Sequence, residues 1–250
     1  MNESTLAVNE IHEGDCLEVM RDIPDGSIDM ILCDMPYGTT ACKWDTVIPF
    51  EPLWEQYERI IKDNGAMVFT ASQPFTSALI MSNLKKFRYE LIWEKTIATN
   101  PFSSHKQPMK KHENICIFYK KQPIYNPQFE KGKPYTDRGN RKNKRSAQRE
   151  MNKTAIINNG YRYPSSVKIF SNGNKNSLHP TQKPVPLFEY LIKTYTNENE
   201  IVLDNCIGSG TTAVAAINTN RNFIGIEQDA GYAAIARQRV NDAIAAKEDN

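Results

Sequence analysis

The sequence has 250 residues, of which 40% are hydrophobic and 24% are charged, as expected of a globular protein with a sizeable core. It has no apolar run of roughly 18 residues and no signal-peptide pattern at its start, so we expect neither a membrane span nor secretion. The five cysteines include no C-x-x-C pair and the four histidines do not cluster. This usage favours reduced thiols in the cytoplasm and argues against a zinc site or a disulfide framework.

The net charge of +2 is unevenly distributed along the chain. Residues 131–149 contain eight basic residues and one acidic residue, a net charge of +7, which leaves −5 for the remainder. Such a segment indicates either a surface that binds a polyanion or an ordinary solvated loop. The basic residues are Lys131, Lys133, Arg138, Arg141, Lys142, Lys144, Arg145 and Arg149.

Apolar strand-like segments alternate with amphipathic helix-like segments through most of the chain. Up to residue 120 we expect strands at 8–12, 28–33, 66–70, 89–93 and 115–119, and helices at 17–23, 52–61 and 75–84. The sequence Asn64-Gly65 would end the second of these helices. After residue 178 we expect helices at 186–195, 211–218 and 230–245, with strands at 201–203 and 222–226. This alternation predicts an α/β fold with a mostly parallel sheet.

Between residues 121 and 178 the apolar periodicity is lost, and only residues 167–170 are expected to form a strand. We interpret this stretch as an insert or a mobile segment.

A first candidate site follows the strand at 28–33. Residues 34–37 read Asp-Met-Pro-Tyr and stand at the carboxyl end of that strand, where open α/β sheets bind their ligands. A carboxylate, a carbonyl held by a proline and a flat ring could clamp a planar base that bears an amino group. These residue types are also common at an ordinary strand exit, so the motif alone leaves both interpretations open.

A second candidate site is the glycine-rich turn after the strand at 201–203. Gly208 and Gly210 permit a tight turn and a close approach to a ligand, and the helix that follows offers unpaired N–H groups. Seventeen residues after Gly210, the next strand ends in Glu227, which could accept hydrogen bonds from a ribose. The turn formally matches a dinucleotide fingerprint. Asp204, however, would repel a pyrophosphate and favours the cationic methionine part of S-adenosylmethionine.

Taken together, these segments resemble the motifs of the amino-methylating DNA methyltransferases of the permuted β type. Residues 34–37 resemble the D-P-P-Y catalytic motif, residues 179–184 match H-P-T-Q-K-P, and residues 204–210 resemble the glycine-rich cofactor motif. Their order, with a basic region between the first two, is the permuted arrangement, and the resemblance covers residues 8–120 and 165–240. Met35 stands where proline is usual, and Asn205-Cys206 stands where Pro-Phe is usual.

The resemblance implies a Rossmann-like methyltransferase fold with helices on both faces of a twisted sheet. Residues 1–120 would be its catalytic half, residues 121–178 a DNA target-recognition insert, and residues 179–250 its cofactor-binding half. The implied catalytic residues are Asp34, Met35 through its carbonyl, Pro36 and Tyr37. The implied ligands of S-adenosylmethionine are Asp15, Cys16, Thr181, Lys183, Asp204, Cys206, Gly208, Gly210, Thr211 and Glu227. Lys183 could equally contact a phosphate, and the basic residues of the insert would bind DNA phosphates.

The sequence therefore predicts a site-specific DNA methyltransferase that modifies adenine N6 in a base flipped out of duplex DNA. Cytosine-N4 methylation is the alternative, although members of that class usually carry serine at the position of Asp34. A DNA-binding protein without catalysis is argued against by the intact Asp34, Pro36 and Tyr37. A nicotinamide-dependent oxidoreductase would leave the basic insert unexplained. Expected partners are double-stranded DNA, a second copy in a homodimer and a cognate restriction endonuclease.

Overall fold

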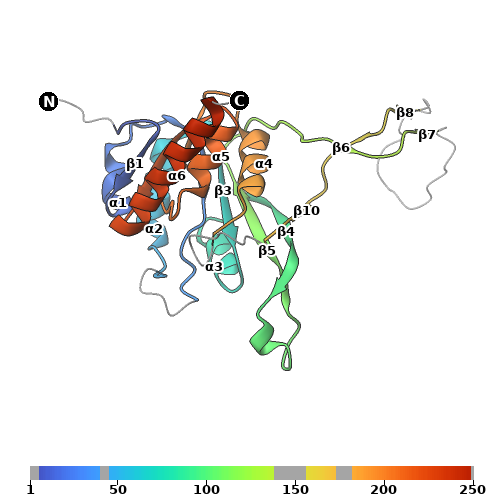
Figure 1. The fold of residues 1–250 in the computed structure, drawn as a ribbon, viewed down its shortest axis with the longest axis horizontal. Coiled ribbons are helices and arrows are strands. Elements are labelled where there is room, and N and C mark those ends of the chain that lie inside the picture. The colour runs from blue at the N-terminus through green and yellow to red at the C-terminus, as the bar shows by residue number, and fades with distance from the viewer. Residues whose placement is uncertain (1–5, 40–44, 138–155, 173–181, 249–250) are drawn as a thin grey trace. The chain divides into compact units, whose positions relative to one another are not determined.

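The structure is a computed structural model that describes residues 6–39, 45–137, 156–172 and 182–248 (Figure 1). The chain forms two compact units. The main unit comprises Met1–Asn126 with Ser166–Asn250, and the small unit comprises Pro127–Ser165.

The main unit is built on an eight-stranded sheet with the strand order β1-β12-β11-β2-β3-β5-β4-β10. Strand β5 is antiparallel to both of its neighbours, and every other neighbouring pair in this sheet is parallel. The predicted α/β fold with a mostly parallel sheet is therefore confirmed. The strands are β1 (Glu10–Glu13), β2 (Ile28–Cys33), β3 (Ile61–Ala71), β4 (Phe87–Thr99), β5 (Lys110–Phe118), β10 (Val167–Phe170), β11 (Ile201–Asp204) and β12 (Asn222–Glu227).

Helices cover both faces of this sheet (Figure 1). One hydrophobic core lies under α4, α5 and α6, and a second lies under α1, α2 and α3. Strand β2 supplies both cores, because Met30 and Leu32 point to one face while Ile31 and Cys33 point to the other. The helices are α1 (Cys16–Val19), α2 (Phe50–Ile60), α3 (Phe75–Ser82), α4 (Val185–Tyr195), α5 (Thr211–Asn218) and α6 (Ala230–Glu248), with short 3₁₀ turns η1 (Met20–Asp22) and η2 (Pro101–Ser103).

The structure corrects the predicted end of α2. The helix ends at Ile60, and β3 begins at once with Ile61, so Asn64-Gly65 lies within a strand. A Cβ at Gly65 would stand 2.7 Å from the Ile61 side chain and 2.8 Å from the Asp29 carbonyl oxygen. Glycine is therefore needed here for a close approach within the sheet, and the helix-end interpretation of Gly65 was wrong.

The strands of the predicted insert also differ from the prediction in two respects. Strand β10 was expected inside the insert, but it pairs with β4 at the edge of the main sheet. The small unit carries two pairs of short antiparallel strands that the sequence did not predict. They are β6 (Glu130–Lys131) with β9 (Tyr161–Arg162), and β7 (Tyr135–Asp137) with β8 (Ile156–Asn158).

In the described part of the small unit, the side-chain contacts include contacts between aromatic rings and with a guanidinium group. Phe129 lies 4.9 Å from Tyr163 between ring centroids, and the guanidinium of Arg162 lies 4.6 Å above the Tyr135 ring. Tyr163 is nevertheless 74% exposed.

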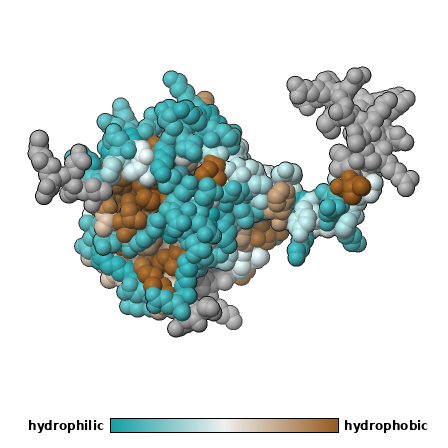
Figure 2. Space-filling model, turned by 90° about the horizontal axis from the view of Figure 1, so that it is seen from above, coloured by the Kyte–Doolittle hydropathy of each residue, from teal (hydrophilic) through white to brown (hydrophobic). Residues whose placement is uncertain are grey.

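The face of the protein shown in Figure 2 is mostly hydrophilic, with apolar patches between the polar regions. Among the described residues, no helix combines the length and apolar character needed to cross a membrane.

Candidate active site

The two candidate motifs leave the sheet on neighbouring strands. Strand β11 pairs with β2 in parallel, with Leu203 beside Ile31, so Asp204 and Asp34 emerge at the same edge. From β11 the chain crosses through α5 to β12, whereas from β2 it crosses through α2 to β3 on the other side. The two strands therefore form the switch point of the sheet, which is where open α/β folds bind ligands.

Asp34 is held in place by donors from three different elements. Its Oδ1 accepts a hydrogen bond from the Tyr37 hydroxyl at 2.7 Å and a second from the hydroxyl of Thr70, in β3. Its Oδ2 accepts from the Lys183 ammonium at 2.7 Å. The side chain of Asp34 is still 22% exposed, so a ligand can reach the carboxylate.

Tyr37 is fixed against the same carboxylate. Its ring stacks on Phe75 of α3, with centroids 5.1 Å apart and an angle of 27° between the planes. Burial, reinforced by the negative charge of Asp34, raises the pKa of Tyr37 well above its ordinary value. The hydroxyl therefore stays protonated and donates to Asp34 throughout the neutral pH range.

The glycine-rich turn has the open geometry that a ligand requires. Gly208 and Gly210 have φ values of +52° and +87°, in the left-handed region that favours glycine. A Cβ on Gly208 would meet no atom within 4 Å, whereas one on Gly210 would lie 3.1 Å from Ala236 of α6. Gly210 is thus required by packing, while Gly208 faces free space. Thr211 is the first residue of α5 and is buried.

Asp204, at the end of β11, is almost fully buried beneath this turn. Its Oδ1 accepts from the Cys206 N–H at 3.1 Å, and its Oδ2 accepts from the Thr212 hydroxyl. Burial raises the pKa of Asp204 to about 7, although both hydrogen bonds oppose the shift. A cation placed at the turn would stabilise the charged form of Asp204, which agrees with a positively charged ligand.

Glu227 ends β12, and Asp15 lies two residues beyond the end of β1, which pairs with β12 in parallel. The Glu227 carboxylate accepts from the Gly208 N–H at 2.8 Å and from the Asp229 N–H at 2.9 Å, so it shapes the glycine turn directly. Asp15 caps α1 by accepting from the Leu17 N–H at 2.8 Å. Both carboxylates border the same end of the sheet as the turn.

The segment before α4 connects the two motifs. Gln182 accepts a hydrogen bond from the Ser209 hydroxyl of the glycine turn at 3.4 Å. The next residue, Lys183, pairs with Asp34. Of these two consecutive residues, Gln182 thus contacts the glycine-rich turn and Lys183 contacts the candidate catalytic motif.

A further connection passes through Tyr57 of α2, which is fully buried. Its hydroxyl donates to the Asn205 Oδ1 at 2.6 Å and lies 3.9 Å from the Met35 sulfur. Met35 and Asn205 are two of the three positions at which these motifs depart from the usual family residues, the third being Cys206. Because Met35 and Asn205 both contact one hydroxyl, these two departures form a single local arrangement that ties the two motifs together.

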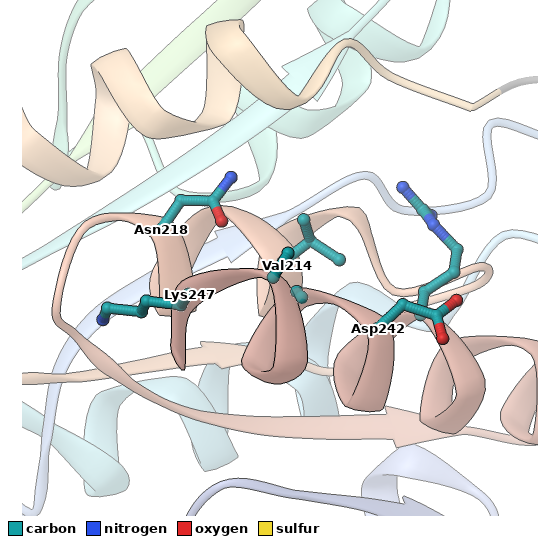
Figure 3. Close-up of a pocket in the computed structure, with 7 residues that line it drawn as sticks. Val214, Asn218, Asp242 and Lys247 are labelled. Atoms are coloured by element: carbon teal, nitrogen blue, oxygen red, sulfur yellow. The ribbon is translucent and has the colours of Figure 1, made fainter. Parts of the chain in front are cut away.

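A separate surface pocket lies between α5 and α6 (Figure 3). It is lined by Val214, Asn218, Asp242 and Lys247, among others. Arg239 also lines it and donates to the Ser209 carbonyl oxygen at 2.5 Å. The pocket does not include any residue of the catalytic motif.

Comparison with known proteins places this geometry in a family. Residues 28–238 match the family described as DNA methylase, which covers N6 and N4 enzymes. The chain belongs to this family. The Type II methyltransferase M1.MboII of Moraxella bovis is 28% identical to the methylase over 259 residues, covering 91% of this chain and 94% of that protein.

Two solved structures share the fold of the methylase. The M1.HpyAVI–SAM complex has a TM-score of 0.65 at 24% identity and covers 93% of this chain and 98% of its own. The PvuII DNA methyltransferase, named as cytosine-N4-specific, has a TM-score of 0.68 at 15% identity and covers 96% of this chain and 93% of its own.

The structure brings most of the predicted site residues of the methylase to one edge of the sheet. Cys16 begins α1, and its neighbour in space, Cys206, raises its pKa. Thr181 lies outside the described residues, as do the basic residues of the insert from Arg138 to Arg149. Lys131 and Lys133 belong to the small unit and are exposed.

Sequence reasoning missed several residues that surround the candidate catalytic motif of the methylase. Thr70, Glu113 and Lys95 come from three strands, and Tyr57 comes from a helix. Thr70 could have been suspected, since it ends the strand predicted beside the motif. Nothing in the sequence indicated that Glu113 and Lys95 are buried beside the motif, because single charged residues usually face solvent.

Proposed function

We propose that this methylase transfers the methyl group of S-adenosylmethionine to the N6 amino group of adenine in double-stranded DNA. The observation that carries the proposal is the fixed, partly accessible carboxylate of Asp34, one strand away from the glycine-rich turn. The group bound at that turn would supply an electrophilic methyl on a sulfonium.

The residues of the turn suit that cofactor. Gly208 leaves space for a ligand, and buried Asp204 favours a nearby positive charge. Glu227, at the end of β12, and Asp15, just beyond the neighbouring β1, present carboxylates where ribose and adenine groups would bind. Cys16, Cys206, Gly210 and Thr211 line the same region. Thr181 is proposed as a cofactor ligand from its motif alone.

The catalytic motif suits an exocyclic amine as methyl acceptor. Such an amine is a poor nucleophile, because its lone pair is delocalised into the ring. Acceptance of its two hydrogens by Asp34 and by the Met35 carbonyl would restore the lone pair and aim it at the methyl group. Tyr37 would stack on the base, which must first leave the duplex. Pro36 restricts Met35 to an extended conformation that presents its carbonyl.

The small unit and its flanking residues are proposed to bind DNA. Lys131 and Lys133 are exposed, and the remaining basic residues of the segment 131–149 add to a local charge of +7. Exposed aromatic rings such as Tyr161 and Tyr163 could contact bases. We also propose that the methylase acts in the cytoplasm, as a homodimer, alongside a restriction endonuclease with the same target.

Cytosine N4 is the second candidate acceptor. The same two acceptors would serve its amino group, and the fold is shared with the cytosine-N4-specific PvuII enzyme. The carboxylate of Asp34 favours adenine, because N4 enzymes usually carry serine at that position.

The test uses methyl-labelled S-adenosylmethionine and unmethylated duplex DNA of diverse sequence, followed by chromatography of the labelled base. We expect label on adenine N6, and a loss of about 10³-fold in rate in Asp34→Ala and Asp34→Asn. Asp63→Ala is the matched control, because Asp63 lies near the opposite end of β3 and pairs with the surface residues Lys120 and Lys121. Label on cytosine would refute the base assignment, and no transfer to any DNA would refute the activity.

A further inference from the structure

Four charged side chains form a continuous chain beneath the catalytic motif. Lys183 lies between two carboxylates, 2.7 Å from Asp34 Oδ2 and 3.5 Å from Glu113 Oε2. On its other oxygen, Glu113 receives the Lys95 ammonium at 2.5 Å. The charges alternate in sign and sum to zero, and they come from the loop after β2, the segment before α4, β5 and β4.

Burying these charges lowers the stability of the fold. The side chains of Lys183, Glu113 and Lys95 are 8%, 11% and 9% exposed. Each buried ion costs several kcal/mol of desolvation, and well-packed apolar residues often stabilise a fold as much or more. Glu113 Oε2 also accepts no hydrogen bond from the described part of the chain. Stability alone therefore does not account for the chain of charges.

The hydrogen bonds of Asp34 show how the cluster could serve catalysis. An ionised carboxylate has about four acceptor positions. Tyr37 and Thr70 fill two of them on Oδ1, and Lys183 fills one on Oδ2. The arrangement fixes the plane of the carboxylate and leaves one position on Oδ2 for the amino group of a substrate.

We propose that Lys183 is a positioning residue that orients Asp34 toward the methyl acceptor, and that Glu113 and Lys95 hold Lys183 there. This assigns Lys183 to the acceptor side of the site, and not to the carboxylate of the cofactor. The inference rests on the proposed use of S-adenosylmethionine as methyl donor, but it is independent of which base is methylated.

The electrostatics agree with a permanently charged Lys183. Burial alone would lower the pKa of its ammonium, but the charges of Asp34 and Glu113 outweigh burial and raise the pKa above its ordinary value. Burial likewise opposes ionisation of Glu113, yet Lys183 and Lys95 lower its pKa. Lys183 and Glu113 therefore stay ionised at neutral pH.

The test compares Lys183→Met with the wild-type protein in two measurements. Calorimetry gives the Kd for S-adenosylmethionine, and single-turnover transfer of labelled methyl to unmethylated duplex DNA gives the rate at saturating cofactor. We expect the Kd to stay within about twofold and the rate to fall by about 100-fold, the effect of a misplaced reacting group. A purely structural role would lower the melting temperature without this separation of rate from cofactor affinity.

A second variant guards against misfolding, since Lys183→Met leaves two buried carboxylates with one cation. The double variant Lys183→Gln with Glu113→Gln keeps the buried charges balanced, with Asp34 and Lys95 remaining, and is expected to show the same separation. Lys168→Met is the control, because Lys168 is equally buried but lies on β10 over the Tyr190 ring. We expect its rate and Kd to be unchanged.

Two results would overturn the inference. A Kd for S-adenosylmethionine that rises tenfold or more, with an unchanged rate at saturation, would make Lys183 a cofactor ligand. An unchanged or faster rate with an unchanged Kd would show that Lys183 does not position Asp34. Absence of methyl transfer by the wild-type protein would instead refute the proposed function itself.

Discussion

Replacing Asp204 with asparagine should flatten the dependence of stability on pH. In the folded protein, burial raises the pKa of Asp204 from 3.8 to about 7. Between these values the folded state binds a proton more readily than the unfolded state does, so the stability contributed by this residue falls as pH rises. At about 1.4 kcal/mol per pH unit, the loss across the window amounts to about 4 kcal/mol.

Asparagine removes the ionisation while keeping an acceptor for the Cys206 N–H and a polar partner for Thr212. Near pH 4 the variant and the wild-type protein should therefore unfold with similar free energies. Above pH 7 the variant should be more stable, by up to about 4 kcal/mol.

The assay is urea unfolding, followed by circular dichroism, at several pH values from about 4 to 8. The quantity of interest is the difference in unfolding free energy between variant and wild type, because other titrating groups cancel in it. A difference that stays constant over this range would refute the reasoning, as would a variant that loses stability only at high pH.

Three further substitutions test other parts of the structure. Tyr57→Phe should lower the unfolding free energy by about 1–3 kcal/mol, because buried Asn205 loses its donor; a neutral result would contradict the bridge between the motifs. Gly208→Ala should weaken calorimetric binding of S-adenosylmethionine while costing only about 1–2 kcal/mol of unfolding free energy, since its Cβ enters free space at positive φ; unaltered binding would contradict the cofactor site. Phe102→Ala should change the unfolding free energy by less than about 0.5 kcal/mol, because Phe102 is 91% exposed; a larger loss would reveal a hidden contact.

The sequence by itself determined the fold class and the two motifs of this protein. Period-two and helical apolar patterns are local, so β2, β11, β12 and the helices after them could be located with small errors at their ends. The strand-end positions of Asp34 and Asp204 follow from the same patterns. Because both strands belong to one parallel sheet, the meeting of these motifs could also be expected.

Local patterns failed where a residue serves a distant contact. Gly65 reads as a helix end, but it is glycine because β3 passes close to the carbonyl oxygen of Asp29 in β2. Strand β10 reads as part of the insert, but its partner is β4, far earlier in the chain. In both cases the neighbour that determines the structure is remote in the chain, so a short stretch of sequence around the residue cannot predict the contact.

Only the tertiary structure decided what surrounds the carboxylate of Asp34. Lys183 was predicted to contact the cofactor or a phosphate, and the structure adds that its ammonium pairs with Asp34 and Glu113. The side chain of Met35, which stands where proline is usual, contacts Tyr57, and only the fold brings these two residues together. A buried charge is stable only beside its counter-charge, and those counter-charges come from strands that the fold, and not the order of the chain, brings together.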